Sequence, residues 1–561
     1  MKYLLSALLC LFACITNAQD LKYEMSEPVD ISTAGWDKVL LMPNGNTVLF
    51  HFEVRKGIIV KVFDKSRKEI ASKKHICNVL DINRLELAGW IGAEAIGNEA
   101  VIFITQEVEN RRTLVRLRIN GNTAGLISEE KLVQSPSFQK EVFTKLLREK
   151  GSDNYYIVCN QTSAGYAQKE INVLAYDATH TRIKDIPLNI DAKGLDDMDL
   201  GSANIDDNGN IALAVEITRI IQHPDVLERV MFICILPKDG TSFQVSKVAL
   251  PSHFRTFETS LAYNPFSKYY QLLTTFQLDG YKQFGFAIKQ VEYNYNELYI
   301  LNQGSPLTPI QLPNSKLNTY IQSTLDTSYI FNGRTRLVCM NDFGLSTVIY
   351  DGILMPKTTN GHFDAKGMKR IIGITQYDEQ GREVNGLALS RAKLKAGKSP
   401  YLFASNNGIT SKNTYALQEI RDRIENEPSN RMQGKASQAF IVKNPFINEP
   451  NNEGQICDIS CMSANKLFYI FYNETYGNFN NTVADIPDSL YSSDFTHATY
   501  YKIGKKKELT KAYLFGQPIE GEYKQLLTQS SHFDEKAKIY ATVVRHRKGK
   551  ETQTKIAWVQ L

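Results

Sequence analysis

The chain has 561 residues, of which 43% are hydrophobic and 22% charged, a composition typical of a folded globular protein with a large core. Its formal net charge of +5 is small for this length, so the sequence lacks the electrostatic footprint of a nucleic-acid-binding protein. The 28 Tyr and 27 Phe far outnumber the 3 Trp, and β-branched residues cluster in short runs, which favours strands.

The first eighteen residues have the pattern of a secretory signal. Lys2 supplies a positive charge, Leu4 to Ile15 form an apolar stretch too short to span a bilayer, and small residues end at Ala18. An alternative is a lipoprotein box with Cys14 lipidated, although Phe12 fits such a box poorly. No later segment is apolar enough to cross a membrane. We therefore predict an exported protein, which is periplasmic, surface-held or extracellular.

Six cysteines follow the signal. They are Cys77, Cys159, Cys234, Cys339, Cys457 and Cys461. Three of them sit inside separate apolar runs, where a thiol behaves as a small buried hydrophobe. The last two, four residues apart on one strand, would lie roughly 13 Å apart and can neither pair nor suit a zinc site. We predict reduced thiols rather than a disulfide framework, and no metal or cofactor.

Units of four short strands recur along the chain. The clearest, 204–250, has tight turns at Asp207-Asn208-Gly209 and Asp239-Gly240 on either side of a longer connection. The predicted units span 37–76, 91–134, 142–190, 204–250, 260–302, 319–391, 456–516 and 523–561.

Two of these units are irregular. In the fifth, we predict a loop at Asp279-Gly280-Tyr281, which divides the strands on either side. The sixth should contain a strand over 319–331, a turn at Asn332-Gly333 and a long interruption over 342–367. Between the sixth and seventh lies a stretch rich in Asn, Lys, Gly and Pro, 392–455, with one amphipathic helix predicted over 414–425. We interpret it as an insertion in a single domain that spans 19–561.

The last unit lacks its fourth strand, whereas Leu21–Val29 belongs to no unit. These facts agree if the N-terminal strand pairs with the end of the chain and closes a ring. In this repeat form the chain resembles the secreted, bacterial-type β-propellers, which implies an all-β ring of seven or eight four-stranded blades. It lacks the Trp-Asp endings of WD40 repeats, the kelch double glycine and the Trp repeat of quinoproteins. Asn204 to Asn210 is only loosely similar to a sialidase aspartate box, so the resemblance implies no specific activity.

In a propeller with strands A to D from axis to rim, the B-to-C and D-to-A connections emerge on one face. The long predicted loops are nearly all of this kind, and functional residues gather on such loops. This face is the candidate binding face. The candidate binding residues are Arg219, His223, Tyr281, Tyr476, Phe479, His497, Arg255 and Asp197.

Several of these features also have ordinary structural explanations. Trp36 and Trp90 open their units in similar contexts and are expected to pack blade against blade. Asp196 and Asp197 could form a carboxylate pair or a calcium site, but a solvated turn or strand cap is the better interpretation. His223 has no visible catalytic partner. No G-x-S-x-G, H-E-x-x-H or phosphate-binding loop occurs, although a triad assembled from distant residues stays open.

The favoured function is an exported binding or scaffolding module whose long-loop face engages a protein or a glycan. The main alternative is a carbohydrate-active enzyme, either a polysaccharide lyase or a glycosidase, with an axial site. A close pair of carboxyl groups or a His/Tyr/Arg cluster would indicate it. The third alternative, a subunit of a cell-envelope assembly, would expose a large apolar patch.

Overall fold

The structure is a computed structural model. It describes residues 21–32, 35–109, 111–134, 144–162, 169–190, 197–220, 227–248, 256–284, 287–301, 309–311, 314–324, 329–341, 344–356, 369–378, 380–393, 459–475, 496–504 and 509–561. The predicted signal, the lipoprotein alternative at Cys14 and the predicted helix over 414–425 lie outside these ranges. The predicted division into signal, propeller and insertion therefore stays a prediction.

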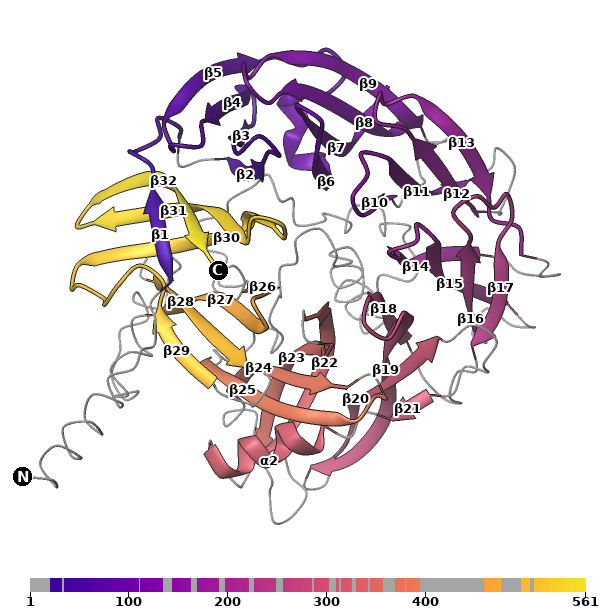
Figure 1. The fold of residues 1–561 in the computed structure, drawn as a ribbon. Coiled ribbons are helices and arrows are strands. Elements are labelled where there is room, and N and C mark those ends of the chain that lie inside the picture. Colours follow the sequence, from indigo (N-terminus) through magenta and orange to yellow (C-terminus); the bar gives the residue numbers. More distant parts are fainter. Residues whose placement is uncertain are drawn as a thin grey trace, which may run out of the picture.

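Within the described residues, the strands form eight four-stranded antiparallel blades arranged around an axis (Figure 1). Blades one to four consist of β2 (Trp36–Leu41), β3 (Thr47–Glu53), β4 (Gly57–Phe63) and β5 (Glu69–His75); β6 (Gly89–Ile96), β7 (Glu99–Val108), β8 (Arg111–Asn120) and β9 (Leu126–Gln134); β10 (Thr144–Arg148), β11 (Tyr155–Thr162), β12 (Lys169–Tyr176) and β13 (Arg182–Pro187); and β14 (Asp197–Ile205), β15 (Ile211–Ile220), β16 (Leu227–Leu236) and β17 (Gln244–Val248).

Blades five to eight follow in the same order. They consist of β18 (Thr256–Asn264), β19 (Tyr269–Phe284), β20 (Ala287–Leu301) and β21 (Pro309–Gln311); β22 (Tyr329–Met340), β23 (Ser346–Pro356), β24 (Lys369–Tyr377) and β25 (Glu383–Lys393); β26 (Ile459–Ala464), β27 (Leu467–Thr475), β28 (Thr496–Gly504) and β29 (Leu509–Tyr513); and β30 (Glu522–Asp534), β31 (Ile539–Lys548), β32 (Glu551–Gln560) and β1 (Lys22–Met25). The predicted all-β propeller is confirmed, with eight blades.

The sequence of a blade reflects its position between two neighbours. In blade one, the inner strands β2 and β3 are buried along nearly their whole length, because the next blade covers each face of the sheet. The outer strand β5 is mostly exposed and carries polar residues. The hydrophobic clusters therefore lie between blades; one of them joins Val39 of blade one to Val543 and Trp558 of blade eight.

Short Asx-type turns connect many of the paired strands. At the first turn of blade four, the Asp206 carboxylate accepts hydrogen bonds of 2.8 Å from the backbone N–H groups of Asn208 and Asn210. Gly209 completes the turn at a φ of +85°, which an L side chain rarely adopts. The side-chain oxygens of Asp64, Asp177, Asn341, Asp378 and Asp534 accept backbone hydrogen bonds in equivalent turns.

The N-terminal strand β1 completes blade eight. It pairs antiparallel with β32, with Lys22 opposite Gln560 and Met25 opposite Ala557. The backbone then continues along the same strand, where the Val29 N–H donates to the Thr554 carbonyl at 2.8 Å. The predicted pairing of these two segments is thus confirmed. Whether this pairing holds the ring together stays a prediction.

Blade six differs from its prediction. The predicted strand over 319–331 is wrong in its first half, since α2 (Ser315–Thr324) occupies 319–324 and buries Leu317 and Ile321 against the blade. Only its last three residues, 329–331, lie in a strand, β22. Gly386 of β25 makes room for α2, because a Cβ there would stand 2.2 Å from the Leu317 nitrogen. The predicted turn at Asn332-Gly333 is also wrong: β22 runs through it, and β23 lies inside the predicted interruption.

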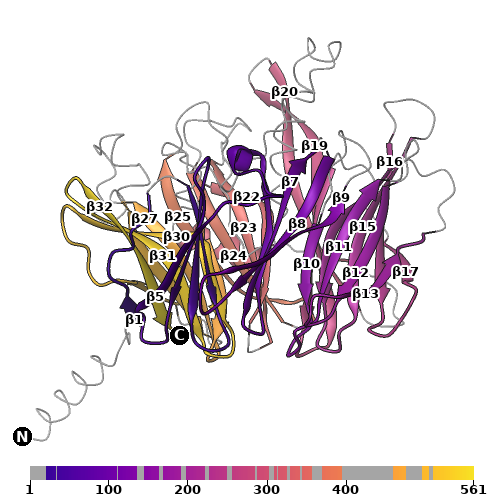
Figure 2. The same cartoon turned by 90° about the horizontal axis from the view of Figure 1, so that it is seen from above.

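Blade five contains two unusually long strands. The predicted loop at Asp279-Gly280-Tyr281 is wrong, because β19 continues to Phe284 and pairs with a single strand, β20, where two were expected. The ladder continues through Gly280, which lies opposite Val291. This hairpin projects beyond the other strands (Figure 2).

The described cysteines agree with the prediction of reduced thiols. Cys77, Cys159, Cys234, Cys339 and Cys461 form no disulfide. Cys159 and Cys234 are buried, and burial raises the pKa of the Cys234 thiol to about 12. Such a thiol stays protonated and packs as an apolar side chain.

Candidate functional site

The strand order gives the propeller two unlike faces. Strands B and D end, and strands A and C begin, on what we call the long-loop face, and the turns from A to B and from C to D lie on the opposite, short-hairpin face (Figure 2). On the long-loop face, β27 ends at Thr475 and β28 begins at Thr496, so a twenty-residue connection starts and finishes there. The 3-10 helix η1 (Ile82–Leu87), between blades one and two, lies on the same face.

The structure describes only some of the predicted binding residues. His223, Arg255, Tyr476 and Phe479 lie outside the described residues. For Arg219, Tyr281 and Asp197, only the backbone is described.

The backbone places two of these residues at the same end of blade four. Asp197 begins β14 and pairs with Thr218, the neighbour of Arg219 on β15. Tyr281 lies within the β19 ladder, opposite Gln290, rather than in a loop. His497, on β28, is the one predicted binding residue whose side chain is described.

His497 lines a small cleft between blades seven and eight. The lining residues are His497, Ala498, Phe515, Gly516, Gln517, Ile519, Glu522 and Lys524. The blades meet here through one parallel bridge between β28 and β30, which places His497 opposite Lys524. Because strands C and A both begin on the long-loop face, the cleft opens at that face.

The cleft combines a neutral imidazole with an ion-paired centre. Burial, reinforced by the Lys524 ammonium, lowers the pKa of His497 to about 4 even though Glu522 opposes the shift. The Glu522 carboxylate accepts from Lys524 at 3.3 Å and from His546 at 2.9 Å. Burial alone would raise the pKa of Glu522, but these two hydrogen bonds outweigh it and lower the pKa. At neutral pH the cleft therefore presents an uncharged imidazole beside a nearly compensated charge cluster.

Apolar and aromatic groups surround this polar floor. The Tyr523 ring lies 5.3 Å from the His497 ring, and Phe515 forms part of the wall. Ile519, at the rim, is 59% exposed and presents an apolar surface to solvent. This mixture suits contact with a flat ligand surface that carries hydrogen-bonding groups at its edge.

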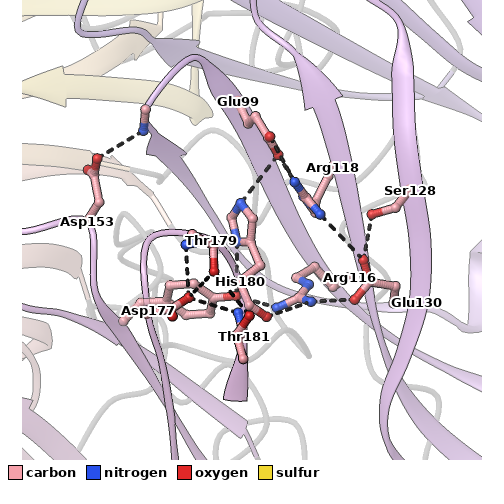
Figure 3. A network of polar contacts seen from close by, with 12 residues as sticks. Glu99, Arg116, Arg118, Ser128, Glu130, Asp153, Asp177, Thr179, His180 and Thr181 are labelled. Carbon is pink, nitrogen blue, oxygen red and sulfur yellow. Dashed lines mark hydrogen bonds and ion pairs between the residues drawn. The ribbon is translucent and has the colours of Figure 1, made fainter. Parts of the chain in front are cut away.

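A second polar constellation joins blades two and three on the short-hairpin face (Figure 3). Arg116 donates to the Tyr155 hydroxyl, to the Glu130 carboxylate and, at 3.2 Å, to the His180 carbonyl. The Tyr155 hydroxyl lies 3.2 Å from Nδ1 of His180, and Nε2 of His180 lies 3.3 Å from Glu99. Glu99 also accepts two hydrogen bonds from Arg118, of 2.7 and 2.9 Å.

Protonation states in this network follow from its contacts. Burial, with Arg118 and Arg116 nearby, lowers the pKa of His180, so the imidazole is neutral and its Nε2–H donates to Glu99. Nδ1 then accepts from Tyr155, whose pKa burial raises to about 12. Tyr155 is fully buried and Arg116 is 3% exposed. The groups therefore hold one another and join two blades, and no ligand reaches their centre.

Trp36 and Trp90 lie in contact, as predicted for blade packing. Their ring centroids are 4.6 Å apart, and Phe52 packs against both rings. Trp36 is buried and belongs to the hydrophobic cluster between blades one and two. These rings fill a repeated gap and form no exposed ligand platform.

No group of three His, Cys, Asp or Glu side chains suited to a metal ion occurs among the described residues. Neither helix in the described part of the chain has the length and apolar content needed to cross a bilayer.

Comparisons with known proteins assign neither a family nor a function to the chain. No protein-family model matches the chain, and no curated protein sequence matches it significantly. Among solved structures, it is similar to the WD40 domain of SCAP from fission yeast, at 8% identity and a TM-score of 0.34, over 96% of this chain and 98% of that one. It is also similar to prolyl oligopeptidase B from Galerina marginata, at 10% identity and a TM-score of 0.37, over 97% of this chain and 58% of that one.

A third similarity is to a polysaccharide lyase, the PL25 ulvan lyase, at 9% identity and a TM-score of 0.34. The alignment covers 62% of this chain and 80% of the lyase. These neighbours are a WD40 domain, a prolyl oligopeptidase and a lyase, and at such identities and TM-scores none of them bears on the activity or ligand of this chain.

Proposed function

We propose that this protein is a propeller-shaped binding module that docks a protein or glycan on its long-loop face and anchors it in the His497 cleft. The observation that carries the proposal is the composition of the cleft. Exposed Ile519 offers apolar contact and the partly exposed Lys524–Glu522 pair offers hydrogen bonds, while buried His497 and Phe515 support the cleft from below. Binding hot spots combine an apolar anchor with a polar surround in this way.

The position of the cleft adds support. Thr475 and Thr496, the strand ends that flank the connection between β27 and β28, lie on the same face, and loops of this kind often carry binding residues. Export through the N-terminal signal remains part of the proposal and would give the face access to envelope or extracellular ligands. A nucleic-acid ligand is disfavoured by the small net charge.

The test is a glycan array and a pull-down with three versions of the intact protein: the parent, Ile519→Asp and Phe266→Asp. Phe266 is a matched control because it is also a large exposed apolar residue, 53% exposed, in a turn on the short-hairpin face. We expect Ile519→Asp to weaken binding at least tenfold and Phe266→Asp to leave it unchanged. Equal binding by all three would exclude the cleft as the anchor. Shortening the connection between Thr475 and Thr496 tests whether the rest of the face contributes.

The carbohydrate-active enzyme remains a second candidate, because the network of Figure 3 contains the expected His/Tyr/Arg combination. Its burial and its place away from the long-loop face count against a catalytic role. Lyase activity would release unsaturated sugars that absorb in the ultraviolet, and Tyr155→Phe should abolish that signal if the network were catalytic.

A subunit of a cell-envelope assembly has weaker support. The exposed apolar residues of blades one to four lie on or beside four separate outer strands; they are Ile70 on β5, Ile76 directly after it, Ile127 on β9, Ile183 on β13 and Val245 on β17. Scattered exposure of this kind is normal for a protein surface.

A further inference from the structure

Ser32, His51 and Asp37 form a chain of hydrogen bonds at the long-loop end of blade one. Asp37 on β2 and His51 on β3 are direct cross-strand partners, so the strand register itself brings their side chains together. Ser32 lies in the segment that leads from blade eight into blade one, shortly after the Val29 backbone bond to Thr554. Three residues from separate segments thus meet where long connections begin and end.

The distances match the order of a nucleophile, a base and a positioning carboxylate. Oγ of Ser32 lies 3.3 Å from Nε2 of His51, and Nδ1 of His51 lies 2.8 Å from Oδ1 of Asp37. Because an ionised carboxylate can only accept, the Nδ1 proton points to Asp37, which leaves the Nε2 lone pair directed at the Ser32 hydroxyl. His51 is 1% and Asp37 4% exposed, whereas Ser32 is half-buried and nearer to solvent.

The surroundings hold the imidazole in place. A Cβ on Gly35, whose φ is +106°, would stand 3.0 Å from Cε1 of His51 and 2.4 Å from the Phe52 carbonyl oxygen, so only glycine allows this close approach. On the other side, Glu53 lies 3.7 Å from Nε2 and pairs with Lys56 at 2.5 Å. Burial would raise the pKa of Glu53, but hydrogen bonds from Lys56 and Ser32 outweigh it and lower the pKa. The Ser32 hydroxyl thus has two acceptors within reach, Glu53 and Nε2 of His51, and its proton must turn to Nε2 for His51 to act as the base.

We propose that Ser32 is the nucleophile of an acyl-transfer site, with His51 as its general base and Asp37 as a positioning residue, and that the site hydrolyses small carboxylic esters. This activity is separate from the binding proposed for the His497 cleft and resides in another blade. The order of side chains is that of a serine-hydrolase triad, which is recognised by geometry and not by position in the sequence.

The reaction balances without any further reactant except water. Ser32 Oγ bonds to the ester carbonyl carbon while its proton passes to Nε2 of His51. The tetrahedral intermediate collapses as His51 returns that proton to the leaving alkoxide, which departs as the alcohol. Water then attacks the acyl-serine, again losing a proton to His51, and the carboxylic acid leaves as Ser32 regains its proton.

The direct test treats the intact protein with a fluorophosphonate probe and locates the modified residue by mass spectrometry. We expect the probe on Ser32 of the folded parent and none on the heat-denatured protein. His51→Ala should slow the labelling at least about 100-fold, and added imidazole should restore part of it. Hydrolysis of p-nitrophenyl acetate should fall in Asp37→Asn through kcat with KM unchanged, a pattern that loss of packing alone would not produce.

Ser66→Ala is the matched control, since Ser66 is an exposed serine in a turn of the same blade. It should label and hydrolyse like the parent. The proposal is overturned if the folded parent carries no probe on Ser32, or if His51→Ala labels at the parental rate. Labelling of Ser32 in the parent protein needs no variant, so this test stays decisive even if a variant fails to fold.

Discussion

The buried imidazole of His497 should make the protein lose stability as the pH falls below neutrality. In the folded chain its pKa is about 4, whereas the ordinary value, 6.5, applies when the chain is unfolded. Between these values the unfolded state binds a proton that the folded state excludes, so the free energy of unfolding decreases with falling pH. The stabilisation is complete above pH 6.5 and is lost progressively below it.

The magnitude follows from the width of this interval. Each pH unit below 6.5 costs about 1.4 kcal/mol per histidine, so at pH 5 His497 alone should lower the free energy of unfolding by about 2 kcal/mol. His497 is only 6% exposed, so solvent screens the effect little. His532 adds to the loss in the same direction, because burial, with Lys38 nearby, lowers its pKa to about 3.

The assay is urea unfolding followed by Trp fluorescence at pH 7.5 and pH 5.0, for the parent and for His497→Asn. The variant should lose about 2 kcal/mol less than the parent between the two pH values. Thr499→Val is the control; Thr499 is buried two residues further along β28 and does not titrate, so its variant should shift both curves equally. If His497→Asn showed the same pH dependence as the parent, the imidazole would not be buried and neutral as the structure has it.

Three further changes test the fold. Deleting Leu21–Val29 should lower the melting temperature by more than about 5 °C, whereas deleting the comparable outer strand β17 should cost clearly less; equal losses would count against ring closure by β1. Arg116→Met should destabilise the protein by about 3 kcal/mol, since it leaves Tyr155 and Glu130 without their shared donor, and a chemical-denaturation difference below 1 kcal/mol would contradict the clamp between blades two and three. Gly386→Ala should cost about 1–3 kcal/mol by pushing α2 away from β25, and unchanged thermal stability would mean that α2 is not packed there.

Local sequence patterns were sufficient to predict most blades. In blades one to four, tight turns and runs of β-branched residues mark each strand, and the structure places strands there. The pairing of Leu21–Val29 with the end of the chain also followed, from counting strands. Blade six was harder to predict, because residues 315–324 have too little apolar content to indicate a helix. The position of α2 also depends on Gly386, which is far away in the sequence.

The candidate site was only partly predictable. His497 stands beside a long predicted loop, which is why it was singled out. Nothing in the local sequence distinguishes Glu522 and Lys524 from other residues at the start of a strand. Only the contact between blades seven and eight brings them close to His497. The Ser32–His51–Asp37 chain could not be predicted for the same reason. No local motif contains the three residues, and it is the register of β2 and β3 that brings Asp37 next to His51. Sequence patterns indicate which residues form one strand, whereas these sites form where segments that are distant in the sequence meet.

The pairing of β1 with β32 also constrains the order of folding. Lys22 and Gln560 are partners although more than 500 residues separate them, so the eighth sheet cannot be complete until the ribosome has made nearly the whole polypeptide. In the folded protein, β1 also contacts both neighbouring blades: Glu24 pairs with Arg67 of blade one, and Tyr23 packs on Phe515 next to blade seven. Until β32 is synthesised, β1 has no partner strand and its backbone edge is unpaired. Chaperones would be most needed at this stage, because an unpaired edge can pair with another chain.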